Sequence, residues 1–222
     1  MIGSIAHQIC PLCRSSSVCN YFSEPKRNYL QCQICSLVFV PSFQFITAEE
    51  EKSHYDLHQN HPDDQGYRRF LNRVLVPMKE KLKPGDSGLD FGSGPGPTLS
   101  LMFEELGYSV KIYDHFYADD SHVLQKEYDF ITATETVEHL HHPKTDLEKL
   151  WKILKPGGFL GIMTKMVIDR ESFANWHYKN DPTHVCFFSQ QTFTWLADLW
   201  QAKLEFYGDD VILFEKAIEV SA

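Results

Sequence analysis

The sequence has no long hydrophobic run. No stretch of about 18 apolar residues occurs in its 222 residues, so no segment is expected to span a membrane. Its first residues also have no basic segment followed by an apolar one, which is the pattern of a secretory signal. These absences predict a cytoplasmic protein, in which thiols stay reduced.

Positive charge is scarce as well. The chain has 21 Lys and Arg against 30 Asp and Glu, which gives a formal net charge of −9. This balance disfavours binding to the polyphosphate backbone of nucleic acids. Internal repeats and low-complexity segments are absent. The length suits one sizeable folded core with a small additional module.

Four of the six cysteines have a spacing typical of zinc ligands. Cys10 and Cys13 form one C-x-x-C pair, and Cys32 and Cys35 form a second pair 18 residues further on. Two such pairs can place four thiolates around one zinc ion. Because four thiolates leave no open coordination position, we predict a small zinc ribbon over residues 6–42 with structural zinc.

The predicted ribbon has little charge with which to recognise nucleic acid. Its basic residues are Arg14, Lys26 and Arg27, and four thiolates around a zinc ion would add about two negative charges. We therefore expect a ribbon that is structural or that contacts a small substrate. An apolar run near residues 37–45 is compatible with a homodimer.

The most informative stretch is the glycine-rich sequence LDFGSGPGPT at residues 89–98, between an apolar strand and an amphipathic helix. Its glycines let the backbone turn sharply and come close to a ligand, toward which the helix directs its first amides. A dinucleotide-binding G-x-G-x-x-G/A pattern read from Gly92 fails at Pro97. The acid Asp90 instead suits a ligand with a positive charge and amine donors.

Further segments follow this turn. Residues 109–113 are strand-like and end in Asp114, whose carboxylate can accept both hydroxyls of a ribose. Residues 128–134 form a buried type of strand that leads into the sequence ETVEHL, and LKPGG opens a further strand. At the end of the chain, residues 203–207 and 211–216 flank a turn and predict a hairpin.

Together these segments resemble the class I S-adenosylmethionine (SAM)-dependent methyltransferases over about residues 66–216. The resemblance implies an α/β fold with a Rossmann-like sheet and a terminal antiparallel hairpin. It also implies an enzyme domain at 66–218, joined to the ribbon by a polar linker at 43–65. The positions that the resemblance assigns to SAM binding are Asp90, Phe91, Gly92, Ser93, Gly94, Gly96, Asp114, His115, Phe116 and Glu135.

The sequence departs from the family between Asp114 and Tyr128. The 13 residues between them are too few for the helix and third strand that the family usually has there. The family's acid on the adenine side therefore has no matching position. Phe116 or Tyr117 could stack on the adenine, with a core role for either as the alternative. A helix over residues 66–82, which Pro77 should bend or interrupt, would lie near the cofactor entrance.

A second constellation combines Glu135, Glu138 and His139 with the distant His184. Glu135 leaves the carboxyl end of a predicted strand, where open α/β sheets bind ligands. A similar E-x-x-E-H sequence with a distal His occurs in small-RNA terminal 2′-O-methyltransferases and in ubiquinone-pathway O-methyltransferases. Three interpretations stay open: a site for Mg²⁺ or another divalent metal, a metal-free general base at His139 or His184, and a structural role.

The sequence thus predicts methyl transfer to a small molecule, without identifying the acceptor or its reacting atom. Residues 176–178 are expected to help wall the acceptor pocket. An RNA methyltransferase whose ribbon recognises the substrate is one alternative, but no basic stripe supports it. A non-catalytic SAM-binding interaction protein is another, and the intact set of motif residues argues against it.

Overall fold

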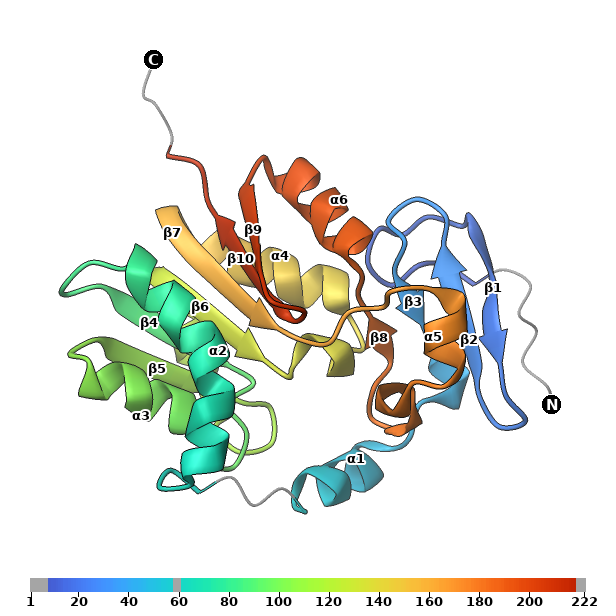
Figure 1. Ribbon diagram of the computed structural model, residues 1–222, viewed down its shortest axis with the longest axis horizontal. Coiled ribbons are helices and arrows are strands. Elements are labelled where there is room, and N and C mark those ends of the chain that lie inside the picture. The colour runs from blue at the N-terminus through green and yellow to red at the C-terminus, as the bar shows by residue number, and fades with distance from the viewer. Residues whose placement is uncertain (1–7, 58–60, 219–222) are drawn as a thin grey trace.

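The computed structural model describes residues 8–57 and 61–218 (Figure 1). Residues 6 and 7 of the predicted ribbon and 58–60 of the predicted linker lie outside this part. The strands are β1 Val18–Ser23, β2 Asn28–Cys32, β3 Val38–Phe39, β4 Ser87–Phe91, β5 Ser109–Tyr113, β6 Tyr128–Thr134, β7 Leu154–Met163, β8 Cys186–Phe187, β9 Lys203–Tyr207 and β10 Val211–Glu215. The α-helices are α1 Ala48–Tyr55, α2 Gln65–Lys81, α3 Thr98–Glu105, α4 Pro143–Ile153, α5 Arg170–Ala174 and α6 Gln190–Trp200.

The larger sheet has the strand order β5-β4-β6-β7-β10-β9. The first four of these strands are parallel, and β10 pairs antiparallel with both β7 and β9. The predicted Rossmann-like sheet with a terminal antiparallel hairpin is therefore confirmed. Within the described residues β5 is the edge of this sheet, and a single short 3₁₀ helix at Ser121–Gln125 occupies the segment that the sequence marked as too short.

Helices cover both faces of the larger sheet. Alternate residues of one strand point to opposite faces, so Phe130 packs with α2 and α3 whereas Ile131 packs with α4 and α6. The predicted interruption at Pro77 does not occur, because α2 continues through it to Lys81. No helix in the part of the chain described here combines the length and the apolar content needed to cross a membrane.

The smaller sheet contains the cysteine-rich segment and has the order β1-β2-β3-β8. Strand β8 comes from far along the chain, between α5 and α6, and lies beside the ribbon (Figure 1). Aromatic side chains fill the junction: the Phe173 ring lies 5.0 Å from that of Tyr29 and 5.4 Å from that of Phe187. The ribbon core is thus continuous with residues of the larger domain.

This junction also explains the apolar run that is compatible with a homodimer. Leu37, Val38, Phe39 and Val40 are all buried inside the chain. Their burial satisfies this part of the apolar run within one molecule. Phe43, further along the same run, is 48% exposed, so the homodimer stays a prediction.

The predicted polar linker contains a helix, α1. Its N-terminus has a complete capping box between Thr47 and Glu50, and acidic residues fill its first turn, where the helix dipole favours them. The helix was not expected because its polar sequence lacks an apolar stripe. Even so, Glu51 is buried and accepts a hydrogen bond from the Tyr55 hydroxyl at 2.9 Å.

Candidate active site and metal centre

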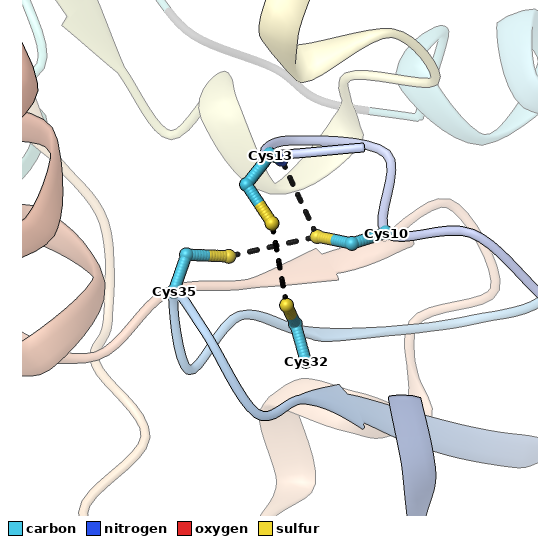
Figure 2. A group of neighbouring side chains, drawn as sticks. All are labelled: Cys10, Cys13, Cys32 and Cys35. Carbon is cyan, nitrogen blue, oxygen red and sulfur yellow. Dashed lines mark hydrogen bonds between the residues drawn. The ribbon is translucent and has the colours of Figure 1, made fainter. Parts of the chain in front are cut away.

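The four predicted zinc ligands come together in the ribbon, with their sulfur atoms directed toward one another (Figure 2). The Sγ atoms of Cys10 and Cys35 are 3.5 Å apart, and those of Cys13 and Cys32 are 3.3 Å apart. A tetrahedron with Zn–S bonds of about 2.3 Å has edges of about 3.8 Å. None of the six cysteines forms a disulfide. The donor set and its spacing therefore fit one structural zinc ion.

The two C-x-x-C turns have matching backbones. The residue after each pair, Arg14 or Ser36, has a positive φ of 65° or 60° and donates its amide to the carbonyl of the first cysteine at 3.0 Å. Non-glycine residues adopt this conformation at a cost of about 1 kcal/mol or more. Two such turns facing each other are expected where metal coordination compensates for the strain.

The glycine-rich loop lies between β4 and α3, at the carboxyl edge of the sheet. Gly92 has a φ of +75°, and a Cβ there would lie 2.3 Å from the Thr136 side chain. Gly94 has a φ of +63° and nothing within 4 Å of the position where its Cβ would be. The first glycine is therefore required by close packing, whereas the second leaves open space where a ligand can approach the backbone.

Asp114 anchors the loop from the end of β5. Its Oδ2 accepts the Gly94 amide at 2.8 Å, and its Oδ1 accepts the amides of Phe116 and Tyr117 at 2.9 and 3.1 Å. The Phe116 ring contacts Tyr55 of α1, with the ring centres 5.7 Å apart, while His115 is exposed. Asp114 and Phe116 thus lie beside the glycine loop, where the resemblance assigns them to the cofactor.

Asp90 lies behind the loop at the end of β4. It is 4% exposed and accepts a hydrogen bond from the Thr132 hydroxyl at 2.8 Å. Burial raises the pKa of this carboxyl to about 6, and the charge of Asp114 adds to the effect. Burial and the charges of Asp90 and Glu135 also raise the pKa of Tyr67 to about 12, which places this α2 side chain near both carboxyls.

Three buried polar atoms around this loop have no hydrogen-bond partner among the described residues: Ser93 Oγ, Thr134 Oγ1 and Glu135 Oε1. Buried polar atoms without a partner are rare, and they mark positions where a ligand can supply one. Glu135 also has a positive φ of 47°, a strained conformation of the kind found at functional sites. These residues fit a cofactor with several polar groups.

The second constellation is partly assembled. One ligand atom each from Glu138, His139 and His184 lies within 4.8 Å of the others, and the His139 and His184 rings are 4.7 Å apart between centres. Glu135 is not part of this group. It is linked to the group through Tyr178, whose hydroxyl lies 3.4 Å from Glu135 Oε2 and contacts Glu138 Oε1.

Both imidazoles are oriented by backbone carbonyls. His184 Nδ1 lies 2.7 Å from the carbonyl oxygen of Tyr178, and His139 Nδ1 lies 3.2 Å from that of Thr183. A carbonyl oxygen can only accept, so each Nδ1 must carry the hydrogen, and each Nε2 of a neutral ring keeps its lone pair. Histidines that ligate metals, or that act as bases through Nε2, are commonly held this way.

Glu138 is fully buried and accepts a hydrogen bond from the Thr164 hydroxyl at 3.0 Å. Burial raises the pKa of Glu138 to about 7. Burial, followed by the charge of Glu138, raises that of Glu135 to about 8. Burial and the adjacent His139 lower the pKa of His184 to about 3. Two carboxyls that resist ionisation beside a histidine that resists protonation form a site where a cation would be stabilised.

Comparisons with known proteins agree with this fold. A family model described as a methyltransferase domain covers residues 59–204, more than half of the chain. The chain belongs to this methyltransferase family. Both the match and the fold support a SAM-dependent methyltransferase, as the glycine-rich motif indicates.

Individual relatives of the methyltransferase are distant. A ubiquinone biosynthesis O-methyltransferase of Pseudomonas savastanoi pv. phaseolicola is 29% identical over 72 residues, which cover 32% of this chain and 31% of that protein. The match therefore spans under a third of that relative's length.

Two solved structures share the fold of the methyltransferase. The 1,6-didemethyltoxoflavin-N1-methyltransferase of Burkholderia thailandensis, solved with 1,6-didemethyltoxoflavin and S-adenosylhomocysteine, has a TM-score of 0.53 at 13% identity and covers 89% of this chain and 99% of that one. A SAM-dependent methyltransferase of Archaeoglobus fulgidus has a TM-score of 0.51 at 18% identity and covers 67% of this chain and 94% of that one.

Some residues at these sites were not singled out by the sequence. Tyr55 packs on His139 with ring centres 5.2 Å apart, and Thr164 binds Glu138. Tyr178 was expected in the acceptor wall, but its link between two carboxyls was not. Each of these contacts joins segments far apart in the chain, so no local sequence pattern predicts them.

Proposed function

We propose that this methyltransferase transfers the methyl group of SAM to a hydroxyl oxygen of a small-molecule acceptor, next to a divalent metal held by Glu138, His139 and His184. The observation that carries the proposal is the orientation of the two imidazoles. Each holds its Nδ1 hydrogen on a backbone carbonyl and keeps the Nε2 lone pair, beside a buried carboxylate. Two imidazoles and one carboxylate form a common site for a divalent metal with open positions.

Glu138, His139 and His184 would hold the metal, which would lower the pKa of the acceptor hydroxyl. The hydroxyl proton would pass to solvent, the oxygen would form a bond to the methyl carbon, and the C–S bond of SAM would break to release S-adenosylhomocysteine. The protein's own part is to exclude water and to align sulfur, methyl and acceptor. Alignment of this kind can lower the barrier by roughly 7–11 kcal/mol. The interpretation of His184 as a metal-free base is less favoured, because a histidine whose pKa is about 3 is a weak base at neutral pH.

For the cofactor, we propose that Asp90, the loop from Gly92 to Gly96, Asp114 and Glu135 contact SAM. The support comes from the open space at Gly94, the unpartnered polar atoms around the loop and the resemblance of the motif. Phe116, which lies between Asp114 and α1, is the proposed neighbour of the adenine. The same proposal assigns structural zinc to Cys10, Cys13, Cys32 and Cys35.

A small-molecule acceptor agrees with the names of two similar proteins, a ubiquinone biosynthesis O-methyltransferase and a 1,6-didemethyltoxoflavin-N1-methyltransferase. The net charge of −9 argues in the same direction, because it opposes binding of RNA. The proposal is tested with methyl-labelled SAM, Mn²⁺ and two sets of acceptors, hydroxylated aromatic compounds and total RNA. Label in RNA alone would overturn it.

Metal binding is tested separately, by calorimetric titration of Mn²⁺ into the zinc-loaded protein in the presence of S-adenosylhomocysteine. We expect His184→Ala to lose Mn²⁺ binding while S-adenosylhomocysteine binding is retained. The exposed His122 provides the control, His122→Ala, which should bind Mn²⁺ as the wild type does. Wild-type protein that methylates an acceptor without binding Mn²⁺ would refute the metal and favour a general base.

A further inference from the structure

A single ribbon arginine reaches across to the loop that carries His184. Arg27 lies in the turn between β1 and β2, and its guanidinium is directed at the segment 179–184 of the methyltransferase domain. Its Nη1 donates to the carbonyl oxygens of Lys179 at 3.1 Å and Asp181 at 2.7 Å. Its Nη2 donates to that of Pro182 at 3.1 Å and also to that of His184.

These contacts use all the Nη donors of the Arg27 guanidinium. The two Nη atoms carry four hydrogens, and four carbonyl oxygens receive them. The planar fork keeps these donors at fixed angles, whereas a lysine ammonium is a single point with flexible donors. A second ribbon residue assists, because the Tyr29 hydroxyl donates to the Lys179 carbonyl at 3.1 Å.

The segment that Arg27 contacts sets the geometry of the cluster formed by Glu138, His139 and His184. The Thr183 carbonyl orients the His139 ring, and the Val185 amide donates to the carbonyl of Glu138 at 2.8 Å. His184 itself belongs to the loop. All three members of the candidate metal site are therefore attached to the segment that Arg27 holds.

We propose that Arg27 is a positioning residue, through which the zinc ribbon keeps the His184 loop in the conformation that brings Glu138, His139 and His184 together. The ribbon then supports the acceptor side of the active site instead of recognising a substrate. The expected effect on metal affinity rests on the proposed function, whereas the hydrogen bonds from Arg27 to the His184 loop do not depend on it.

This role differs from simple docking of the ribbon on the domain. Docking is already provided by the aromatic junction around Phe173 and by the pairing of β3 with β8. Loss of Arg27 should therefore leave the zinc in place and the ribbon attached, while the loop becomes mobile. The two roles predict different rates of hydrogen exchange for the amides of residues 183–185.

The experiment compares Arg27→Ala and Arg27→Lys with the control Lys26→Ala in the full chain. Lys26 is the adjacent cation in the same turn and is exposed. The readouts are zinc content, hydrogen exchange of the amides of residues 183–185, and the affinities for Mn²⁺ and S-adenosylhomocysteine. We expect Arg27→Ala to speed exchange at His184 and Val185 by about 10-fold or more, because it removes four hydrogen bonds from a charged donor and one alone is worth about that factor.

The Mn²⁺ affinity of Arg27→Ala should fall by a similar factor, while its zinc content and its affinity for S-adenosylhomocysteine stay at the wild-type level. Arg27→Lys should lie in between, and Lys26→Ala should match the wild type. Added guanidinium ion at millimolar concentration should restore the slow exchange of Arg27→Ala, because it can occupy the same carbonyls.

Wild-type exchange rates in Arg27→Ala would overturn the proposal. If Arg27→Ala loses zinc, the test passes to Arg27→Lys, which must keep zinc and still show faster amide exchange than Lys26→Ala. Equal exchange rates in Arg27→Lys and Lys26→Ala would overturn the proposal. If the wild type binds no Mn²⁺, the metal of the proposed function fails, and the exchange rates continue to test the grip on the loop.

Discussion

Replacing Asp90 by Asn should stabilise this protein and weaken its cofactor binding. In the folded chain, burial raises the pKa of Asp90 to about 6 from its ordinary 3.8. The difference corresponds to about 3 kcal/mol of preference for the neutral form. Asn has the same shape as the neutral carboxyl and can still accept the hydrogen bond from Thr132.

The sign of the effect follows from proton linkage. Because the folded-state pKa of Asp90 is raised, its contribution to stability is complete below about pH 4 and is lost as the pH rises through about 6. Wild type and Asp90→Asn should therefore unfold with similar free energies near pH 4. At pH 8 the variant should be more stable by up to about 3 kcal/mol.

The measurement is urea unfolding at pH 4 and pH 8 without cofactor, with the exposed Asp209→Asn as the control. A parallel titration with S-adenosylhomocysteine at pH 8 should show roughly 10- to 100-fold weaker binding to Asp90→Asn, because a charge-assisted contact to the amine is lost. An equal difference in stability at the two pH values would refute the assigned burial cost. Unchanged affinity would refute the proposed contact between Asp90 and SAM.

Two further predictions concern the zinc and the glycine loop. Cys32→Ser should lose the zinc and have a lower melting temperature, as measured by metal analysis and thermal unfolding. The control Cys19→Ser alters an exposed cysteine outside the cluster and should keep the zinc and the wild-type melting temperature. Gly92→Ala should lower the free energy of unfolding by roughly 2 kcal/mol or more, because its φ is +75° and its Cβ would overlap Thr136. The matched control is Gly208→Ala, which has a φ of +59° and open space around it and should cost about 1 kcal/mol. Equal losses in the two glycine variants would contradict the packing argument.

The features that the sequence predicted well are local in the chain. The glycine loop, the carboxylate at the end of β5 and the terminal hairpin each depend on residue types within a few positions of one another. The absence of a full helix and third strand after Asp114 followed from chain length alone. Each of these patterns expresses a backbone requirement that does not depend on distant partners.

The features that it did not predict depend on pairing across the chain. Strand β8 is a two-residue strand, too short to produce a periodic pattern, yet it completes the ribbon sheet. Helix α1 was taken for linker because its sequence is polar, although Tyr55 at its end packs on His139. Arg27 was counted only among the basic residues of the ribbon, since nothing around it in sequence indicates four carbonyl partners.

These long-range contacts change how the ribbon should be understood. Its core is completed by Phe173 and by β8, and the segment between these two elements carries Tyr178 and His184. Loss of the zinc proposed for the ribbon would therefore disturb the segment of Tyr178 and His184 before it reached the glycine-rich loop, which lies in other elements. Since the Nη donors of Arg27 are directed at the protein's own carbonyls, they are not available to bind phosphate. The ribbon is thus better suited to hold the enzyme's own loop than to recognise a nucleic acid.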